Sequence, residues 1–312
     1  MRVIITGGSG LIGRALTAEL IAGGYEVIIL SRHPRGLDGL SPAIRMEKWD
    51  GHTSQGWAHI ADGSFAIVNL AGENLAAGRW TEERRRRLRE SRLAAGKAMV
   101  EAVHLATIKP QVLIQASAIG YYGPHGDEEI SEDSPPGTDF LAKLAVEWEA
   151  STAPLDNVLR RVIIRTGVVL SKEGGALRRL LQPYRFLLGG RLGSGRQWVS
   201  WIHLADEVRA IRFLLEKQEA RGPYNLTSPN PVKQNQLAKV LGRILRRPAW
   251  FPTPGFILRL ILGEMSSVLL TGQRVLPRRL QEIGFEFCFP DLEKALGSLL
   301  GGQRSQDSDL MC

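Results

Sequence analysis

The sequence predicts an α/β fold: a doubly wound parallel sheet with helices on both faces, plus a smaller mixed α/β lobe towards the C-terminus. In the first half of the 312 residues, short apolar runs rich in valine and isoleucine alternate with longer helical patterns. Strands of a parallel sheet are buried on both faces and therefore read as nearly continuous apolar runs. Near residue 168 the pattern changes, and glycine, arginine and proline then interrupt the chain more often.

Strands and helices can be assigned in order from these patterns. Strands are expected at 2–6, 26–31, 66–71, 111–117 and 161–167. Helices are expected at 11–24, 81–106 and 139–152. This alternation is typical of right-handed parallel crossovers.

The domain boundaries follow from the change of pattern. Residues 1–168 are expected to form the sheet domain, with 201–222 packing back onto it. Residues 169–300 are expected to form mainly the second lobe, which would carry the substrate. The polar residues 301–312 are expected to form a disordered tail.

Composition narrows the class of protein. The chain has two cysteines, Cys288 and Cys312, too few for a disulfide framework and without metal-ligand spacing, so no metal site is predicted. No apolar run approaches the roughly 18 residues needed to span a bilayer, and the N-terminus begins with a strand rather than a signal peptide. We therefore expect a cytoplasmic protein without a membrane partner.

The chain is basic, with a formal net charge of +8 and a pI near 9.8. Its densest basic run, 82–92, contains interspersed glutamates on a predicted helix, which is typical of a solvated helix face. The alternative is that one or two of these arginines hold a cofactor phosphate. No recognised RNA- or DNA-binding pattern accompanies the charge, so nucleic acid is not expected as a partner.

The sequence TGGSGLIG at 6–13 lies between the first predicted strand and the first predicted helix, the context in which a glycine motif is informative. Gly7 permits a tight turn, Gly10 lets the backbone approach a pyrophosphate, and Gly13 permits close helix–sheet packing. The amides and the helix dipole would then face the anion. We therefore predict a Rossmann-type dinucleotide site here, with Ser9, Leu11 and Ile12 completing the turn.

The end of the second strand indicates which dinucleotide binds. NAD-binding folds place a carboxylate there for the ribose 2′-hydroxyl, whereas this chain has Ser31 and Arg32. A guanidinium pairs bidentately with phosphate oxygens. This favours NADP(H) over NAD(H), unless Arg32 is only a loop cation.

With these motifs in place, the chain resembles the extended short-chain dehydrogenase/reductase superfamily. It is most similar to the atypical branch described as epimerase family proteins, the 39U group, over nearly its whole length. The segments that carry the resemblance are TGGSGLIG (6–13), NLAGENLAAGRW (69–80), SR (91–92), SAIGYYG (117–123), DFLAKLAVEWE (139–149), RTGVVLSKEGGAL (165–177), GSGRQWVSWIHLAD (193–206), GPYNLTSPNPV (222–232) and GQRVLPRRLQEIGF (272–285).

The resemblance implies further cofactor residues. Leu70, Ala71 and Gly72 would lie along the cofactor, Arg92 would approach it from the long helix, and Arg165 would end a strand on the ligand side. The second lobe would close over the nicotinamide, with Trp201 and His203 near the substrate.

The superfamily's catalytic pattern is incomplete in this chain. A serine, a tyrosine and a lysine four residues after the tyrosine do the chemistry in that superfamily. Lys143 fits the lysine position, but Asp139 and Phe140 stand where the tyrosine is expected. Ser117 fits the serine position tolerably.

Candidate replacements for the tyrosine lie near that serine. Tyr121 or Tyr122 could supply the proton, or both could be packing aromatics. Lys143 could hold the nicotinamide ribose or be a solvated helix lysine, and His203 is a conceivable base.

Three functions remain open from the sequence. The first is an NADP(H)-dependent oxidoreductase acting on a small carbonyl, alcohol or sugar derivative. The second is a nucleotide-sugar epimerase, and the third is a non-catalytic NADP(H)-binding sensor or partner protein. The retained Ser117 and Lys143 favour the first and the missing tyrosine favours the third. The sequence leaves monomer or homodimer open.

Overall fold

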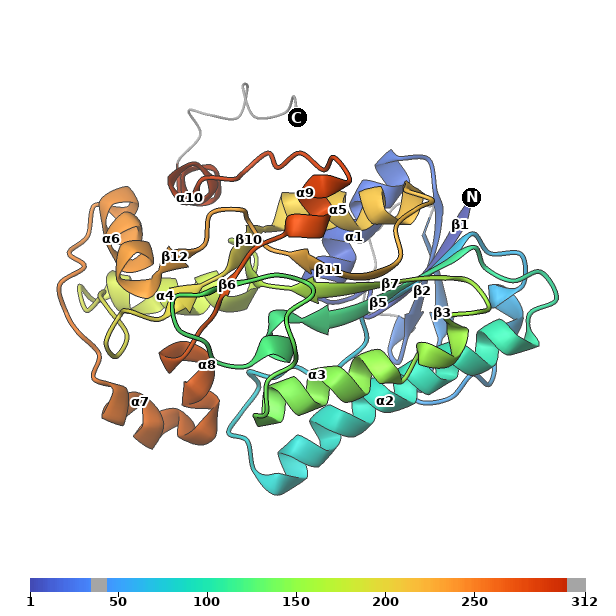
Figure 1. Ribbon diagram of the computed structural model, residues 1–312, viewed down its shortest axis with the longest axis horizontal. Coiled ribbons are helices and arrows are strands. Elements are labelled where there is room, and N and C mark those ends of the chain that lie inside the picture. Colours follow the sequence, from blue (N-terminus) through green and yellow to red (C-terminus); the bar gives the residue numbers. More distant parts are fainter. Residues whose placement is uncertain (35–43, 302–312) are drawn as a thin grey trace.

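A seven-stranded parallel sheet forms the centre of the molecule (Figure 1). The computed structural model describes residues 1–34 and 44–301. The predicted disorder of 301–312 falls, apart from Gly301, outside the described residues. The strands of the sheet, in chain order, are β1 (Arg2–Thr6), β2 (Glu26–Ser31), β3 (Ile44–Lys48), β4 (Ala66–Asn69), β5 (Val112–Ala118), β7 (Arg160–Thr166) and β11 (Gly222–Leu226).

The strand order is β11-β7-β5-β4-β1-β2-β3, and neighbouring strands are parallel throughout. The chain winds from β1 outwards through β2 and β3, then returns to the other side of β1 with β4. The direction of winding therefore reverses between β1 and β4. In open α/β sheets, ligands bind beyond the carboxyl ends of the strands at such a reversal.

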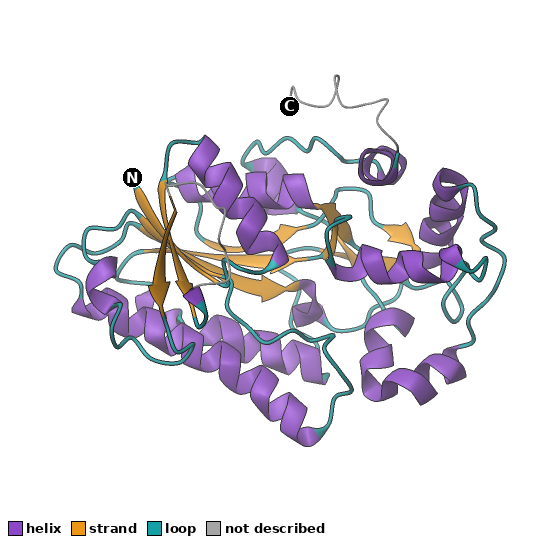
Figure 2. Ribbon diagram, turned by 180° about the vertical axis from the view of Figure 1, so that it is seen from behind, coloured by secondary structure: helices purple, strands orange, loops and turns teal. Residues whose placement is uncertain are grey.

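Helices cover both faces of the sheet (Figure 2). On one face α1 (Leu11–Ala22) packs against α5 (Leu204–Glu216), and on the other α2 (Glu82–Leu105) packs against α3 (Phe140–Ala150). Alternate residues of each strand enter two separate cores. Ile5 belongs to the core under α1 and α5, while its neighbour Ile4 belongs to the core under α2. Because both faces are buried, the inner strands β1, β2 and β4 are mostly apolar.

The doubly wound α/β class predicted from the sequence is confirmed. The structure adds two edge strands, β3 and β11, that the sequence patterns did not reveal. β3 carries Arg45 and Glu47 on an exposed edge, and β11 begins with Gly222 and Pro223. Edge strands tolerate charged residues and proline because one side of the strand makes no ladder hydrogen bonds.

The second lobe combines three two-stranded sheets with helices around its own apolar core, which includes Leu177, Trp201, Leu237 and Leu296. Its first strand lies between β5 and α3, but most of the lobe follows β7, and the chain returns to the main sheet with α5 and β11. Its elements are β6 (Glu129–Ile130), β8 (Val168–Leu170), α4 (Gly175–Arg185), β9 (Trp198–Val199), β10 (Trp201–His203), β12 (Val232–Lys233), α6 (Gln234–Leu245), α7 (Gly255–Leu262), α8 (Ser267–Leu270), β13 (Arg274–Val275), α9 (Arg278–Glu282) and α10 (Leu292–Leu300).

The arginines of α2 are mostly paired with carboxylates. Arg86 bonds Glu83 within the helix, and Arg89 bonds Glu147 of α3. No helix among residues 1–34 and 44–301 is long and apolar enough to cross a membrane.

Replacing Gly13 in α1 by alanine should lower the melting temperature. A Cβ there would lie 2.3 Å from the carbonyl oxygen of Gly7, and backbone atoms cannot move aside without distorting the turn. Forcing such a contact costs roughly 1–3 kcal/mol. The matched control is Gly297→Ala in α10, where a Cβ meets nothing within 4 Å. Its melting temperature should rise, because alanine favours a helix interior over glycine by about 1 kcal/mol. A Gly13→Ala protein as stable as the parent would contradict this account of the turn.

Candidate functional site

The glycine turn after β1 is shaped by close backbone contacts. Gly7 adopts a φ of +68°, which disfavours side chains, and a Cβ there would lie 2.8 Å from the carbonyl oxygen of Leu70. Gly10 begins α1 without any side-chain cap. The first amides of the helix are therefore left for an anion, as in phosphate-binding turns. Ser9 and Gly10 are exposed, while Leu11 and Ile12 are half-buried.

The segment after β4 lies directly beside this turn. Thr6 Oγ1 donates to Asn69 Oδ1 at 2.7 Å and accepts from the amide of Ala71 at 3.1 Å. Asn69 in turn donates to Gln115 Oε1 of β5 at 2.9 Å. Thr6, Asn69 and Gln115 are fully buried. This chain of bonds holds Leu70, Ala71 and Gly72 next to the glycine turn, so the structure brings these two predicted groups together.

The end of β2 is basic. Arg32 is exposed directly after Ser31, and Ser31 is paired in register with Lys48 of β3. Asp50, which follows β3, accepts from the amides of His52 and Thr53 and is turned into its own loop. Arg32 is therefore available to an anion at this edge, and the geometry suits a 2′-phosphate better than a bare hydroxyl.

Arg92 lies behind the β4 segment rather than in solution. Its guanidinium is buried, donates to the carbonyl of Leu88 at 2.9 Å and lies over the ring of Trp148 at 4.8 Å. Burial lowers the pKa of Arg92 to about 10, while Glu73 acts in the opposite direction. A Cβ on Gly72 would lie 3.2 Å from the Arg92 Cζ. Arg92 thus supports the Gly72 backbone as a buried cation.

Arg165 is the centre of a buried polar network. Its Nε and Nη2 both donate to the Glu149 carboxylate at 2.9 Å, and its Nη1 donates to Tyr122 Oη at 3.0 Å and to the Glu132 carbonyl at 3.1 Å. Burial disfavours the charged form, but the bonded Glu149 outweighs it and raises the pKa of Arg165 above its ordinary value. Arg165 is thus neutralised within the protein.

Two of the predicted proton-transfer hydroxyls belong to this network. Ser117 donates to Glu149 Oε1 at 2.6 Å, and Tyr122 donates to Asn225 Oδ1 at 2.7 Å. Both side chains are buried, and burial raises the pKa of Tyr122 to about 12. Tyr121 differs: it is half-buried, its ring lies 3.5 Å below the Arg165 guanidinium carbon, and its hydroxyl makes no hydrogen bond within the described residues.

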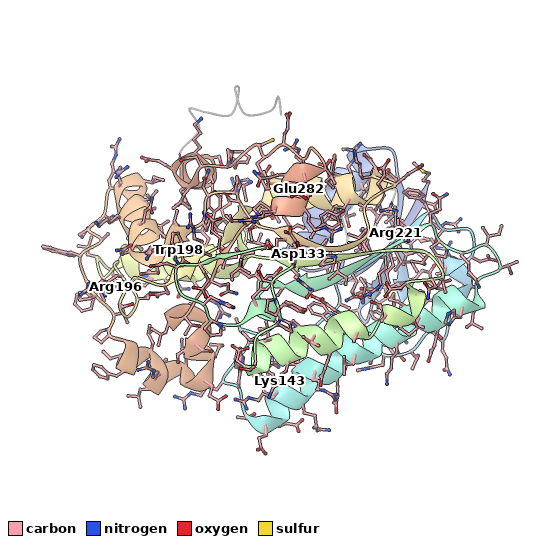
Figure 3. All side chains as sticks on the ribbon, viewed as in Figure 1. Asp133, Lys143, Arg196, Trp198, Arg221 and Glu282 are labelled. Carbon is pink, nitrogen blue, oxygen red and sulfur yellow. The ribbon has the colours of Figure 1, made fainter. Side chains whose placement is uncertain are left out.

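Helix α3, which carries Lys143 and the position where the superfamily has its tyrosine, begins with a side-chain cap. Asp139 accepts from the amide of Ala142 at 2.8 Å as the N-cap of α3. The carboxylate at the tyrosine position is thus used to start the helix. Lys143 is exposed on α3 (Figure 3). The exposed Val146 lies three residues further along the same helix.

The two second-lobe residues suggested by the resemblance are buried. Trp201 donates to the carbonyl of Asn230 at 3.1 Å. His203 accepts from the amide of Ala205 at 3.1 Å and stacks on Phe289. Burial lowers the pKa of His203 to about 4, so it caps α5 as a neutral ring.

Several polar residues at this edge were not identified from the sequence: Glu132, Glu149, Asn225 and Glu207. Each is buried and bonded to a residue far away in the chain. A signal did exist, because a serine and an arginine inside predicted buried strands require polar partners. The sequence does not say which helix supplies them.

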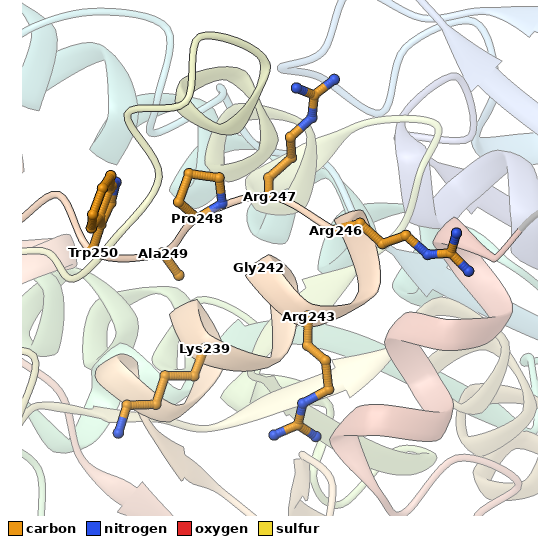
Figure 4. Close-up of a pocket in the computed structure, with 8 residues that line it drawn as sticks. All are labelled: Lys239, Gly242, Arg243, Arg246, Arg247, Pro248, Ala249 and Trp250. Atoms are coloured by element: carbon orange, nitrogen blue, oxygen red, sulfur yellow. The ribbon is translucent and has the colours of Figure 1, made fainter.

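A basic hollow of about 520 Å³ opens at the far end of the second lobe, lined by Lys239, Arg243, Arg246, Arg247 and Trp250 among others. Its charged side chains point away from one another (Figure 4), and Arg243 pairs with Glu293 of α10. It therefore does not form a convergent anion site. Within the described residues, no group of three or more histidine, cysteine or acidic side chains could hold a metal ion.

Comparison with known proteins agrees with this geometry. Residues 3–227 match the model of the NAD dependent epimerase/dehydratase family, and residues 253–304 match a domain of unknown function, DUF1731. The chain is 37% identical over 302 residues to the chloroplastic SDR39U1 homolog of Arabidopsis thaliana, an epimerase family protein, covering 96% of this chain and 87% of that one.

A bacterial relative and a solved human structure extend the match. The epimerase family protein YfhF of Bacillus subtilis is 38% identical over 308 residues, covering 98% of this chain and 100% of that one. The crystal structure of human epimerase family protein SDR39U1 (isoform 2) with NADPH has a TM-score of 0.88 and 34% identity, covering 97% of this chain and 100% of that one.

Replacing Glu149 by glutamine should destabilise the fold strongly. The side chain of Arg165 is 5% exposed and that of Glu149 10%, so the change leaves a buried cation unpaired. Breaking such a pair costs about 3–5 kcal/mol, measurable by urea unfolding. Glu147→Gln on the same helix is the matched control, since its pair with Arg89 is about half exposed and worth less than about 1 kcal/mol. Equal losses of unfolding free energy for the two variants would show that burial does not strengthen the Arg165–Glu149 pair.

Proposed function

Because the chain belongs to the NAD dependent epimerase/dehydratase family, we propose that it is an NADP(H)-dependent oxidoreductase of the extended short-chain dehydrogenase type. Its substrate would be a small carbonyl compound or the corresponding alcohol, including sugar derivatives. The proposal has two parts, the choice of cofactor and the source of the proton.

The observation that carries the cofactor choice is the basic end of β2. Arg32 is exposed beside Ser31, and the nearby Asp50 is bonded to its own loop. A 2′-phosphate would find the Arg32 guanidinium there, while Asp50 is turned away into its own loop. The human relative solved with NADPH supports the same choice.

The remaining cofactor contacts follow from the sheet edge. The pyrophosphate would lie on the amides that follow Gly10, with Leu70 to Gly72 alongside and Arg92 supporting that segment from behind. Arg165 would act indirectly, since its donors are taken up by Glu149, Tyr122 and the Glu132 carbonyl. Lys143 would need to reach the ribose from the exposed side of α3.

When bound, NADPH supplies a hydride to the substrate carbonyl carbon, and the protein must supply a proton to the oxygen. Ser117 and Tyr122 are bonded inside the network and Asp139 caps a helix. Tyr121 keeps a half-buried hydroxyl without a protein partner among the described residues. We assign it the role of proton donor, a role that general-acid side chains perform with a gain of roughly 10²–10⁴ in rate.

A second function has its own support. The engagement of Ser117, Tyr122 and Asp139 elsewhere favours an NADP(H)-binding protein without turnover, which would sense the cofactor or present it to a partner. A nucleotide-sugar epimerase remains the third alternative and would use NAD(H) that stays bound through the cycle.

Cofactor selectivity tests the first part. Titrations followed by nicotinamide fluorescence and melting temperature should show NADPH binding at least tenfold more tightly than NADH. Arg32→Ala should weaken NADPH about 10- to 100-fold, the value of a charged hydrogen bond, and leave NADH unchanged. Arg2→Ala, at the opposite end of the sheet, is the control and should change neither. Tighter binding of NADH, or no effect of Arg32→Ala, would refute the assignment.

Turnover tests the second part. A panel of small aldehydes, ketones and sugar derivatives should reveal NADPH oxidation, and Tyr121→Phe should reduce kcat roughly 10²-fold or more with NADPH affinity unchanged. A parent protein that binds NADPH tightly but turns over nothing would establish the binding-protein function instead. Conversion of nucleotide sugars without net oxidation of the bound cofactor would establish the epimerase.

A further inference from the structure

Glu207 is a buried acid that the proposed chemistry does not use. It lies in the first turn of α5 and is completely inaccessible to solvent. Its Oε1 accepts a hydrogen bond from Thr166 Oγ1 at 2.8 Å. Its Oε2 is enclosed and has no hydrogen-bond partner among the described residues. A buried polar atom without a partner costs stability, so folding alone does not explain a glutamate at this position.

The pair lies at a defined place on the sheet edge. Thr166 is the last residue of β7 and is paired in register with Ala118, the last residue of β5. A dinucleotide spans the reversal of the winding, one half on each side. Since Arg32 follows β2, the adenine half would lie over β1, β2 and β3. The nicotinamide half would then lie over β4, β5 and β7, next to Thr166.

In the bond between the two residues, the Thr166 hydroxyl donates to Glu207 Oε1. Burial raises the pKa of Glu207 to about 8, with only the bond from Thr166 acting in the opposite direction. Glu207 is therefore mainly a neutral acid at pH 7. Because Thr166 gives its hydroxyl proton to Glu207, the Thr166 oxygen is left as an acceptor. Thr166 itself is half-buried and Arg165 before it points to the opposite face of the sheet, towards Glu149.

We propose that Glu207 is a positioning residue that holds the Thr166 hydroxyl as an acceptor for the carboxamide N–H of the nicotinamide. This inference rests on the proposed NADP(H) binding. It predicts that the pair contributes to the nicotinamide half of the cofactor and not to the adenine half.

Two ligands separate these contributions. NADPH contains both halves, whereas 2′-phospho-ADP-ribose contains the 2′-phosphate, pyrophosphate and second ribose without the nicotinamide. Dissociation constants for both would be measured by calorimetry on the full chain and on four variants. Thr166→Val and Glu207→Leu remove the bond, while Thr166→Ser and Glu207→Gln retain a donor and an acceptor at the same places.

We expect Thr166→Val and Glu207→Leu to weaken NADPH three- to tenfold, the value of one neutral hydrogen bond, and to change 2′-phospho-ADP-ribose less than twofold. Thr166→Ser and Glu207→Gln should bind both ligands like the parent. Glu207→Leu should melt at the same temperature as the parent or higher, because it removes a buried acid.

The inference fails if both ligands weaken together, if neither changes, or if the serine and glutamine variants behave like the valine and leucine variants. Should Glu207→Leu fail to fold, the comparison of Thr166→Val with Thr166→Ser decides. A parent protein that binds neither ligand would instead refute the proposed function itself.

Discussion

The ion pair between Arg165 and Glu149 is the interaction on which the candidate site depends. An arginine at the end of a buried strand must be neutralised, and α3 supplies the carboxylate through two bonds of 2.9 Å. The remaining guanidinium donor reaches Tyr122 and the Glu132 carbonyl, which belong to the segment between β5 and α3. Glu132 also accepts from the amide of Asn225 in β11. One buried cation thus ties together β7, α3, β11 and the connecting segment.

This arrangement determines which groups remain available for chemistry. The network consumes the hydroxyls of Ser117 and Tyr122, and the cap of α3 consumes Asp139. The cofactor end of the same edge is different, because the first turn of α1 has no side-chain cap. The Leu70–Gly72 segment is held beside this turn through Thr6 and Asn69. The site therefore has many groups suited to holding a dinucleotide and few hydroxyls or acids free to donate a proton. Tyr121 lies below the Arg165 guanidinium, at the network.

Local patterns predicted most of the fold and the glycine turn of the candidate site. The alternation of apolar runs predicted the five inner strands and their helices, and the glycine turn was identified because its strand, turn and helix are consecutive in the chain. The edge strands β3 and β11 lack the apolar pattern, since one side of each makes no ladder bonds. The partners of Ser117 and Tyr122 lie 32 and 103 residues away, and no local pattern predicts such contacts. Glu207 was also not identified from the sequence, because its burial, which raises the pKa of its carboxyl, arises only in the folded chain.

The most direct test of this account is a crystal structure of the protein with NADP⁺. The account predicts a 2′-phosphate within hydrogen-bond distance of Arg32, Ser117 and Tyr122 still bonded to Glu149 and Asn225, and the Tyr121 hydroxyl facing the nicotinamide. A complex in which Ser117 or Tyr122 leaves the network to contact the nicotinamide would contradict the claim that Arg165 withdraws them from catalysis. A 2′-phosphate remote from Arg32 would contradict the basis of the cofactor choice.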